Sequence, residues 1–415
     1  MSQPSLASVL QPAWTVPLSS QYFVNSVAIT NDGSRVVAGT FYHNYTQGPS
    51  AGPSAPDLRV QEPPAAAPGI SPYGTFGIYC YDNQGSLRWS DPDEMFEGVY
   101  WVAISGDGQI AAAAGWYSDG KNPTPTAQGL LRFYDATGTQ CHCLLDYTAI
   151  PTRVNAVALS GDGSVAVAIA GNTIYIFSQQ NGVFSPPGTI TLPSTTPQAI
   201  AVHPDGTWLA AVDNDGTVYM ILNARDPGYK TYTWQAQNGP TMHSVAISGQ
   251  STYFVVGADD GTVYLFEQGA MIQSQQPVAQ YQLSPNVVIR WVALSGNAGL
   301  VTAVFNLNEV GMLTALTFDG QNLNFLWHFQ LNEMPNSTST DAQGLYVTAA
   351  DGYNGPGDLY LFTGGSGTQV ASPLPVSAMC WPMFLSADGS AIAAGSDNGT
   401  LYYFQTSSST DRKRE

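Results

Sequence analysis

One alternation of apolar and polar positions recurs along the chain. A short apolar run leads into a polar turn, usually with Asp-Gly, and a second apolar run follows. Because the side chains of a strand alternate between its faces, Val157 and Leu159 share one face and small alanines occupy the other. The pattern predicts two antiparallel strands joined by a tight turn. It occurs eight times, at 25–34, 100–109, 155–164, 198–207, 243–252, 290–299, 335–344 and 381–390.

Two further strands follow the first pair. Several copies turn through Asp or Asn before Gly, as at 213–216, 259–261 and 397–399, and such turns need a positive φ. The next strand is aromatic, as in TVYMIL at 217–222. The acidic hairpins lack the spacing and the terminal Glu of a calcium loop, so turn chemistry is the favoured interpretation. Each repeat therefore predicts four strands.

Four strands in each of eight repeats predict an all-β fold, a single eight-bladed β-propeller with four antiparallel strands per blade. The last copy supplies only three strands by Phe404. The segment AWTVPL at 13–18 is the spare strand, so we expect the ring to be closed by the N-terminal strand pairing with the last blade. Trp14 is then expected to dock against that blade.

The repeats also predict the domain boundaries. The propeller is expected at residues 1–407 and a C-terminal tail at 408–415. A long loop at 43–73, rich in Pro, Gly and Ala, is inserted in the first blade, and both a lid and a disordered tether remain open for it. The closing strand is expected at 13–18 and the blades at roughly 25–90, 98–147, 153–192, 197–235, 241–283, 288–331, 334–376 and 378–404.

The fourth strand carries a resemblance to known families. A strand ending at Asp82 is followed by Gly85 and then Trp89. This resembles the tryptophan-docking repeat of the quinoprotein-like (PQQ-repeat-like) propellers, although 134–143 lacks the Trp and 318–327 keeps one at its end. The run-turn-run pattern also resembles WD40 and YVTN-type propellers. Resemblance to pyrroloquinoline quinone dehydrogenases would imply adjacent cysteines and a bound calcium; because the chain has no adjacent cysteines, the resemblance implies a fold and no activity.

Charge narrows the range of partners. The chain has 30 Asp and Glu against 12 Lys and Arg, a net charge of −18, which opposes binding to a phosphate backbone or an anionic lipid surface. No nucleic acid partner and no membrane insertion are expected, and no apolar run reaches the length of a span. The N-terminal segment lacks the features of a signal peptide, so cytoplasmic is the default location, although the low charge content is compatible with export.

The cysteines predict no framework of disulfides. Cys80, Cys141, Cys143 and Cys380 are few and scattered, and the spacing of Cys141 and Cys143 is not that of a zinc knuckle. We expect them to be small buried residues of the sheets.

Functional residues are expected at the mouth of the axial channel. In propellers of this kind, the loops entering the innermost strands and those joining the second and third strands share one face. The position just before each innermost strand varies and is polar or aromatic, as in a ligand site, but a solvated channel mouth would also be lined by polar residues. By alignment these positions are Asn25, Tyr100, Asn155, Gln198, His243, Arg290, Pro335 and Trp381.

Other candidate residues lie on the same face. The stretch at 115–129 is expected to expose Trp116 and Tyr117 as aromatic platforms, which suit sugars, polar peptides or cations. No cofactor is assigned, with Ca²⁺ as a candidate, and the weak candidates for a metal site are the acidic residues Asp91, Asp93, Glu94 and Glu97.

No catalytic residue is assigned. The chain lacks a GxSxG elbow, an HExxH helix and a Walker loop. His203 is expected to be a turn residue on the opposite face, and His243 is the one histidine at the mouth, as a wall residue or a base.

Three hypotheses on function follow. The first is a non-enzymatic propeller that presents its top face to a protein, peptide or glycan. The second is an enzyme that uses the axial pocket, either a quinoprotein-like oxidoreductase or a metal-dependent hydrolase or lyase. The third is a structural subunit of a larger assembly.

Overall fold

The computed structural model describes residues 8–18, 23–41, 76–93, 96–118, 128–193, 197–223, 228–285, 287–353 and 355–406. Nearly all of its regular structure is β-strand, and the helix α1 (Gln268–Gln273) is one and a half turns long. Within these ranges, no helix has both the length and the apolar composition needed to cross a membrane. The fold is therefore all-β, as the repeats predict.

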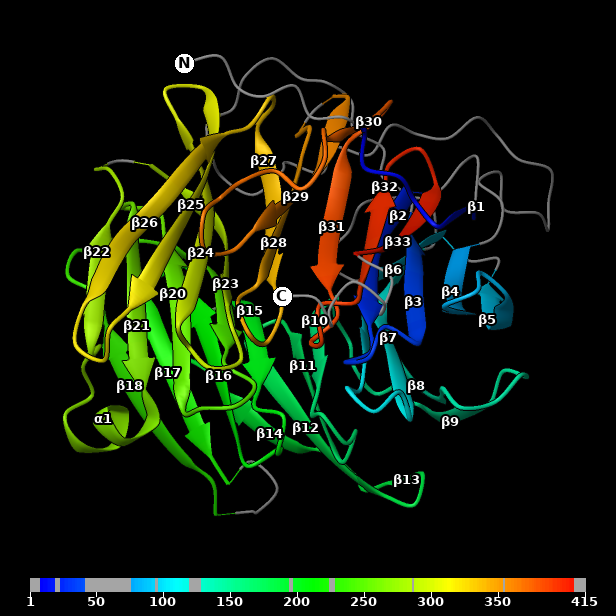
Figure 1. Cartoon of the computed structure of the whole chain (residues 1–415). Coiled ribbons are helices and arrows are strands. Elements are labelled where there is room, and N and C mark those ends of the chain that lie inside the picture. The colour runs from blue at the N-terminus through cyan, green and yellow to red at the C-terminus, as the bar shows by residue number, and fades with distance from the viewer. Residues whose placement is uncertain are drawn as a thin grey trace.

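The sheets are arranged around a common axis (Figure 1). Each innermost strand lies against the next one in chain order, and β31 in turn lies against β2. The innermost strands are β2 (Phe23–Ile29), β6 (Phe96–Ile104), β10 (Val154–Leu159), β15 (Pro197–Val202), β19 (Met242–Ile247), β23 (Ile289–Leu294), β27 (Pro335–Thr340) and β31 (Cys380–Leu385).

The second and third strands pair antiparallel with their predecessors. The second strands are β3 (Arg35–Phe41), β7 (Ile110–Ser118), β11 (Val165–Ala170), β16 (Trp208–Asp213), β20 (Tyr253–Ala258), β24 (Leu300–Leu307), β28 (Tyr346–Asp351) and β32 (Ala391–Ser396). The third strands are β4 (Phe76–Asp82), β8 (Gln128–Asp135), β12 (Thr173–Gln180), β17 (Thr217–Leu222), β21 (Thr262–Glu267), β25 (Val310–Phe318), β29 (Gly357–Thr363) and β33 (Thr400–Gln405).

A fourth strand completes each set. These strands are β5 (Leu87–Asp93), β9 (Cys143–Asp146), β14 (Gly188–Thr191), β18 (Lys230–Gln235), β22 (Ala279–Gln282), β26 (Leu323–Gln330) and β30 (Leu374–Val376), with the short β13 (Val183–Phe184) beside β12. The sets β2–β5 and β6–β9 form one continuous sheet through the residue pair Phe41 and Gly98.

The last sheet takes its fourth strand from the other end of the chain. β1 (Trp14–Pro17) pairs antiparallel with β33, with Trp14 opposite Tyr403. The two rings stack with centroids 4.8 Å apart and an interplanar angle of 3°. The indole Nε1 of Trp14 also donates to the carbonyl of Asn83, which lies 3.2 Å away in the turn between β4 and β5. Trp14 thus contacts both the last sheet and the first.

The hydrophobic core lies between neighbouring sheets. All six residues of β11 and all six of β16 are buried. Val167 and Ile176 of one sheet belong to the same apolar cluster as Leu209 and Ile221 of the next. Apolar burial between the sheets is therefore the main stabilising contribution, and it repeats around the axis.

The turns after the innermost strands share one hydrogen-bond motif. Ser105 Oγ donates to Asp107 Oδ1 at 2.7 Å and accepts from the amide of Ile110 at 3.0 Å. The same arrangement starts at Thr30, Ser160, Ser295 and Ser386. His203 stands in this position after β15, with Nδ1 2.8 Å from Asp205 Oδ1. This confirms His203 as a turn residue.

The acidic hairpins at the opposite ends of the sheets are held by turn chemistry, as predicted. Asp213 Oδ1 accepts from the amides of Asp215 and Thr217 at 2.9 and 2.8 Å, and Tyr219 donates its hydroxyl to Asp213 Oδ2 at 2.8 Å. Gly216 has φ +79°, the left-handed conformation that the Asp-Gly pattern requires.

The prediction that all four cysteines are buried is wrong for two of them. Cys80 and Cys380 are buried, and burial raises the pKa of the Cys80 thiol to about 12. Cys141 and Cys143 are exposed because they lie at and just before β9, a short outer strand that pairs only with β8.

Candidate functional site

Each innermost strand has an irregular pairing near its start. In β23, Ile289 pairs with Phe305 and Trp291 with Val304, so Arg290 has no partner across the ladder. Such a β-bulge redirects the side chain of the extra residue. We call the end of the molecule where these strands begin the top face; β31 begins at the top of Figure 1. The bulge residues, here called the mouth ring, are Asn25, Tyr100, Asn155, Gln198, His243, Arg290, Asn336 and Trp381, the last with Pro382.

Two asparagines of the mouth ring connect adjacent sheets. Asn25 is 7% exposed and donates its Nδ2 to the carbonyl of Tyr100 at 2.9 Å. Asn336 is 3% exposed and donates its Nδ2 to the carbonyl of Cys380 at 3.0 Å. These side chains satisfy main-chain carbonyls at the bulges, so part of the mouth ring has a structural role.

Two guanidinium groups lie at the mouth, each over an aromatic ring. Arg290 Cζ is 4.5 Å from the ring centroid of Tyr353, and Arg153 Cζ is 4.5 Å from that of Trp116. Both are within the range of cation–π attraction. Burial raises the pKa of Tyr100; the charge of Arg153 acts in the opposite direction and Tyr353 acts in the same direction.

His243 is the histidine of the mouth ring. Burial lowers the pKa of its imidazole; the nearby Asp259 acts in the opposite direction and Arg290 in the same direction. The neutral form is therefore favoured. Among the described residues, no hydrogen-bond partner is present for its buried Nε2.

Aromatic side chains fill the axis below the mouth ring. Trp101 of β6 stacks on Trp291 of β23, with centroids 5.8 Å apart and an interplanar angle of 24°. Trp291 also contacts Trp381 and Phe384, at 6.3 and 6.0 Å between centroids. β6 and β23 are separated by the same number of innermost strands in both directions around the axis, so the stacked pair spans the centre.

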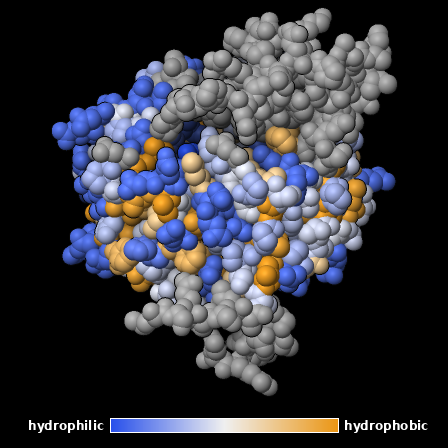
Figure 2. All heavy atoms as spheres, turned by 90° about the horizontal axis from the view of Figure 1, so that it is seen from above, coloured by the Kyte–Doolittle hydropathy of each residue, from blue (hydrophilic) through white to orange (hydrophobic). Residues whose placement is uncertain are grey.

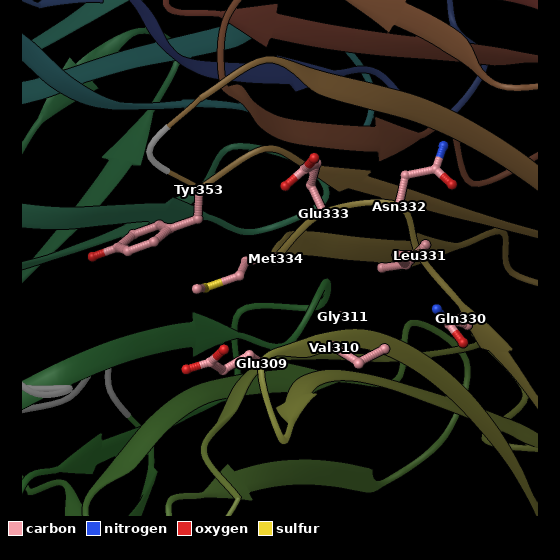
Figure 3. Close-up of a pocket in the computed structure, with 9 residues that line it drawn as sticks. All are labelled: Glu309, Val310, Gly311, Gln330, Leu331, Asn332, Glu333, Met334 and Tyr353. Atoms are coloured by element: carbon pink, nitrogen blue, oxygen red, sulfur yellow. The ribbon is translucent and has the colours of Figure 1, made fainter.

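A cavity of about 470 Å³ opens between the sheet β23–β26 and the sheet β27–β30 (Figure 3). Its lining combines carboxylates, main-chain groups, a thioether and an aromatic ring; the residues are Glu309, Val310, Gly311, Gln330, Leu331, Asn332, Glu333, Met334 and Tyr353. Tyr353 also contacts Arg290 of the mouth ring. Met334 Sδ accepts from Asn306 Nδ2 at 3.3 Å. The cavity is therefore a groove of the top face that adjoins the mouth ring.

The view from above shows apolar residues as small separate groups among polar ones over the part of the surface that is coloured (Figure 2). The large exposed apolar side chains of the described residues, such as Leu87, Val183 and Phe325, belong to different sheets. Polar recognition on the top face fits this surface better than a large hydrophobic interface.

Comparison with known proteins identifies the architecture. The family model for the WD domain, G-beta repeat, matches residues 186–221 and 228–267. Among solved structures, Sqt1 from Chaetomium thermophilum is similar with a TM-score of 0.69 and 13% identity, over 97% of this chain and 99% of that chain. The fold is that of a WD40 β-propeller. No curated protein matches the chain in sequence.

Two other WD40 propellers show the same likeness. The Cps50 (Swd1) β-propeller domain from Myceliophteria thermophila has a TM-score of 0.55 and 13% identity, over 74% of this chain and 95% of that chain. The RRP9 WD40 repeats have a TM-score of 0.56 and 15% identity, over 83% of this chain and 92% of that chain. The comparisons support the WD40 part of the expected resemblance and give no specific support to the quinoprotein-like part.

The expectation that Trp116 is an exposed platform is wrong. Trp116 is 2% exposed, and its ring packs against Phe41 and Tyr100 at centroid distances of 4.9 and 5.0 Å. It lies within β7, where Phe41 and Tyr100 of the neighbouring strands cover its ring. The side chain of Tyr117 lies outside the described part of the structure.

The acidic stretch is only partly described. Asp91 Oδ2 is 3.2 Å from Arg132 Nη1 and accepts the hydroxyl of Tyr134 at 2.7 Å. This network gives Asp91 a structural role, and its candidacy as a metal ligand stays a prediction. Glu94 and the side chains of Asp93 and Glu97 lie outside the described residues, as does the loop at 43–73. Among the described residues, no group of three or more His, Cys, Asp or Glu side chains is suited to hold a metal ion.

The alignment of the mouth ring is off by one residue in β27. Pro335 pairs in register with Asp351, and the bulge residue is Asn336. The sequence reasoning also missed the aromatic axis and the groove. Trp101 and Trp291 directly follow bulge residues at equivalent positions, and this shared spacing was the available signal.

Proposed function

We propose that the ring has eight blades and is closed by the N-terminal strand. The contact of β31 with β2 and the pairing of β1 with β33 support this arrangement. The single pair between Phe41 and Gly98 is a local bridge between two blades rather than a merged blade. The proposed blades follow the repeats from 25–90 to 378–404, within a propeller of residues 1–407.

We further propose that this propeller is a non-enzymatic binding module whose top face receives a peptide segment of a partner protein. The observation that carries the proposal is the groove beside the mouth ring. The cavity of about 470 Å³ is the size of a small-ligand pocket and holds a few chemical groups of a peptide at a time. The exposed carboxylates of Glu309 and Glu333 in its lining can accept hydrogen bonds from the N–H groups of a peptide.

The aromatic side chains at the axis favour binding of a ligand on the top face. The stack of Trp101 on Trp291 spans the centre below the mouth ring, so a ligand that enters from above meets aromatic rings. At fold level, one similar propeller is described as Sqt1 bound to the N-terminus of ribosomal protein L10. That complex supports a protein or peptide partner over a glycan for this chain.

The test is a selection of peptides on the immobilised full-length chain, followed by two matched variants. Val310→Arg places a long charged side chain in the groove. Leu345→Arg makes the same change at a 61% exposed residue in the turn between β27 and β28, at the other end of the sheets. Peptides that lose at least about tenfold in affinity with Val310→Arg and keep it with Leu345→Arg support the proposal. Equal affinity for both variants, or the absence of any selected peptide, would show that it is wrong.

A further inference from the structure

Unpartnered polar atoms gather on one arc of the mouth ring. The bulge residues of the successive strands β19, β23, β27 and β31 are His243, Arg290, Asn336 and Trp381. Each has a buried side-chain atom that lacks a hydrogen-bond partner among the described residues: His243 Nε2, Arg290 Nε, Asn336 Oδ1 and Trp381 Nε1. Native structures leave few such atoms, and each one costs free energy. Their clustering at four consecutive bulges points to a ligand.

The atoms specify the chemistry of that ligand. Arg290 Nε and Trp381 Nε1 carry hydrogens and can only donate. Asn336 is 3% exposed, its Oδ1 can only accept, and the hydrogen bond from Nδ2 to the carbonyl of Cys380 fixes the orientation of the amide. Two donors beside one acceptor fit a ligand that offers negatively charged oxygens next to an N–H group.

Two of the few cationic groups of the chain lie at the mouth. The mouth holds Arg153 and Arg290, two of only 12 Lys and Arg residues in a chain of net charge −18. Stacking on Tyr353 restrains the guanidinium of Arg290, which reduces the entropy lost when it binds an anion. Asp259 lies near His243, and no ion pair joins Arg290 to a carboxylate in the described part of the chain.

We propose that this arc of the mouth ring binds a carboxylate group, with Arg290 and Trp381 as donors and Asn336 Oδ1 accepting from an adjacent amide N–H. The proposal deepens the proposed function, because a peptide offers both groups at its C-terminus or at an acidic side chain. A monoanion is favoured over a phosphate dianion because the field of the whole chain opposes each added negative charge. Arginine supplies the charge-assisted hydrogen bonds that make a carboxylate bind more tightly than its amide.

Probes of the size of one amino-acid residue test the carboxylate site separately from the groove. N-acetylglycine represents a peptide C-terminus and N-acetylaspartate α-amide represents an acidic side chain. N-acetylglycinamide and N-acetylasparagine amide are their neutral counterparts, and inorganic phosphate is the competing anion. Titrations of the full-length chain at constant ionic strength follow tryptophan fluorescence, because Trp291 and Trp381 lie at the site. We expect saturable binding of one or both carboxylates, at least about tenfold tighter than their amides.

Matched variants locate the site. Arg290→Gln should weaken carboxylate binding at least about tenfold, whereas Lys230→Gln, which removes one charge from an exposed residue of β18, should leave it unchanged. Trp381→Phe keeps an aromatic ring, loses the N–H group and should weaken binding several-fold. Equal binding of acid and amide, tighter binding of phosphate, no binding of any probe, or an unchanged affinity of Arg290→Gln would each overturn the proposal.

The two proposals can fail separately. Val310→Arg alters the groove and should bind the single-residue probes like the unmodified chain. Carboxylate binding without any selected peptide would leave the anion site standing and refute the peptide-binding function. Selected peptides that bind the Arg290→Gln variant with unchanged affinity would leave the peptide-binding function standing and refute the anion site.

Discussion

The indole rings of Trp101 and Trp291 stack across the centre of the molecule, 5.8 Å apart between centroids. They come from β6 and β23, on opposite sides of the ring of innermost strands. Packing between adjacent sheets restrains two opposite sheets only through the sheets that lie between them. The stack of Trp101 on Trp291 joins them directly.

The stack should contribute a measurable coupling energy. Trp101→Ala and Trp291→Ala should each lower the free energy of unfolding by about 2 kcal/mol, because both side chains are half-buried. The double variant should cost less than the sum, with a coupling of about 1 kcal/mol. Urea denaturation of the four proteins measures this. Trp234, which packs against Tyr264 and Phe266 in an outer strand, provides the control: Trp234→Ala should be additive with Trp101→Ala.

The repeats predict the strands because each repeat carries the same local sequence pattern. Period-two alternation, an Asp-Gly turn and an aromatic third strand recur, and the structure places strands at each of them. The same regularity locates most of the mouth ring, since the bulge falls at an equivalent position near the start of each innermost strand. In β27 the sequence PNSTST lacks the usual apolar residues, and the alignment by pattern chose Pro335 in place of Asn336.

The site itself depends on contacts between distant repeats. Nothing local to Trp101 indicates that its partner is Trp291, and the groove forms only where loops of two sheets meet. Trp116 follows a run of alanines and precedes a polar stretch, which suggested exposure. Its burial arises from Phe41, 75 residues earlier in the chain, which a single-repeat pattern cannot reveal.

Trp116 should behave as a core residue. Because it is 2% exposed, Trp116→Ala should lower the free energy of unfolding by about 3 kcal/mol, and Trp116→Phe by about 1 kcal/mol. Urea denaturation measures both. A loss of less than about 0.5 kcal/mol for Trp116→Ala would show that the side chain faces solvent.

The N-terminal strand should stabilise the whole ring. Trp14→Ala removes the stack on Tyr403 and should cost about 2 kcal/mol, whereas Trp14→Phe keeps an aromatic contact and should cost about 1 kcal/mol. A chain lacking residues 1–18 leaves the edge of β33 unpaired and should form dimers or larger species, because unpaired edges recruit other strands. Thermal denaturation and light scattering measure these effects. An unchanged melting temperature of the truncated monomer would contradict closure by β1.

The stability of the chain should fall as the pH rises from about 4 to about 7, in part through Asp397. Burial raises the pKa of its carboxyl from 3.8 to about 7. Between these values the folded chain binds the proton and the unfolded chain has released it, so raising the pH favours unfolding. Asp397→Asn stays neutral and should be more stable than the unmodified chain at pH 8, by on the order of 2 kcal/mol, and closer to it at pH 4.

The comparison isolates one group, because Asp351, whose pKa burial raises to about 6, titrates in both proteins and cancels in their difference. Asp319→Asn is the control: hydrogen bonds from the amides of Asn322 and Gln321 lower the pKa of Asp319, so its contribution is already complete above pH 4 and fades only in more acidic solution. Urea denaturation of the three proteins from pH 4 to pH 8 measures the slopes. If the free energies of unfolding of Asp397→Asn and of the unmodified chain changed equally with pH, the Asp397 carboxylate would be ionised and solvated in the folded state.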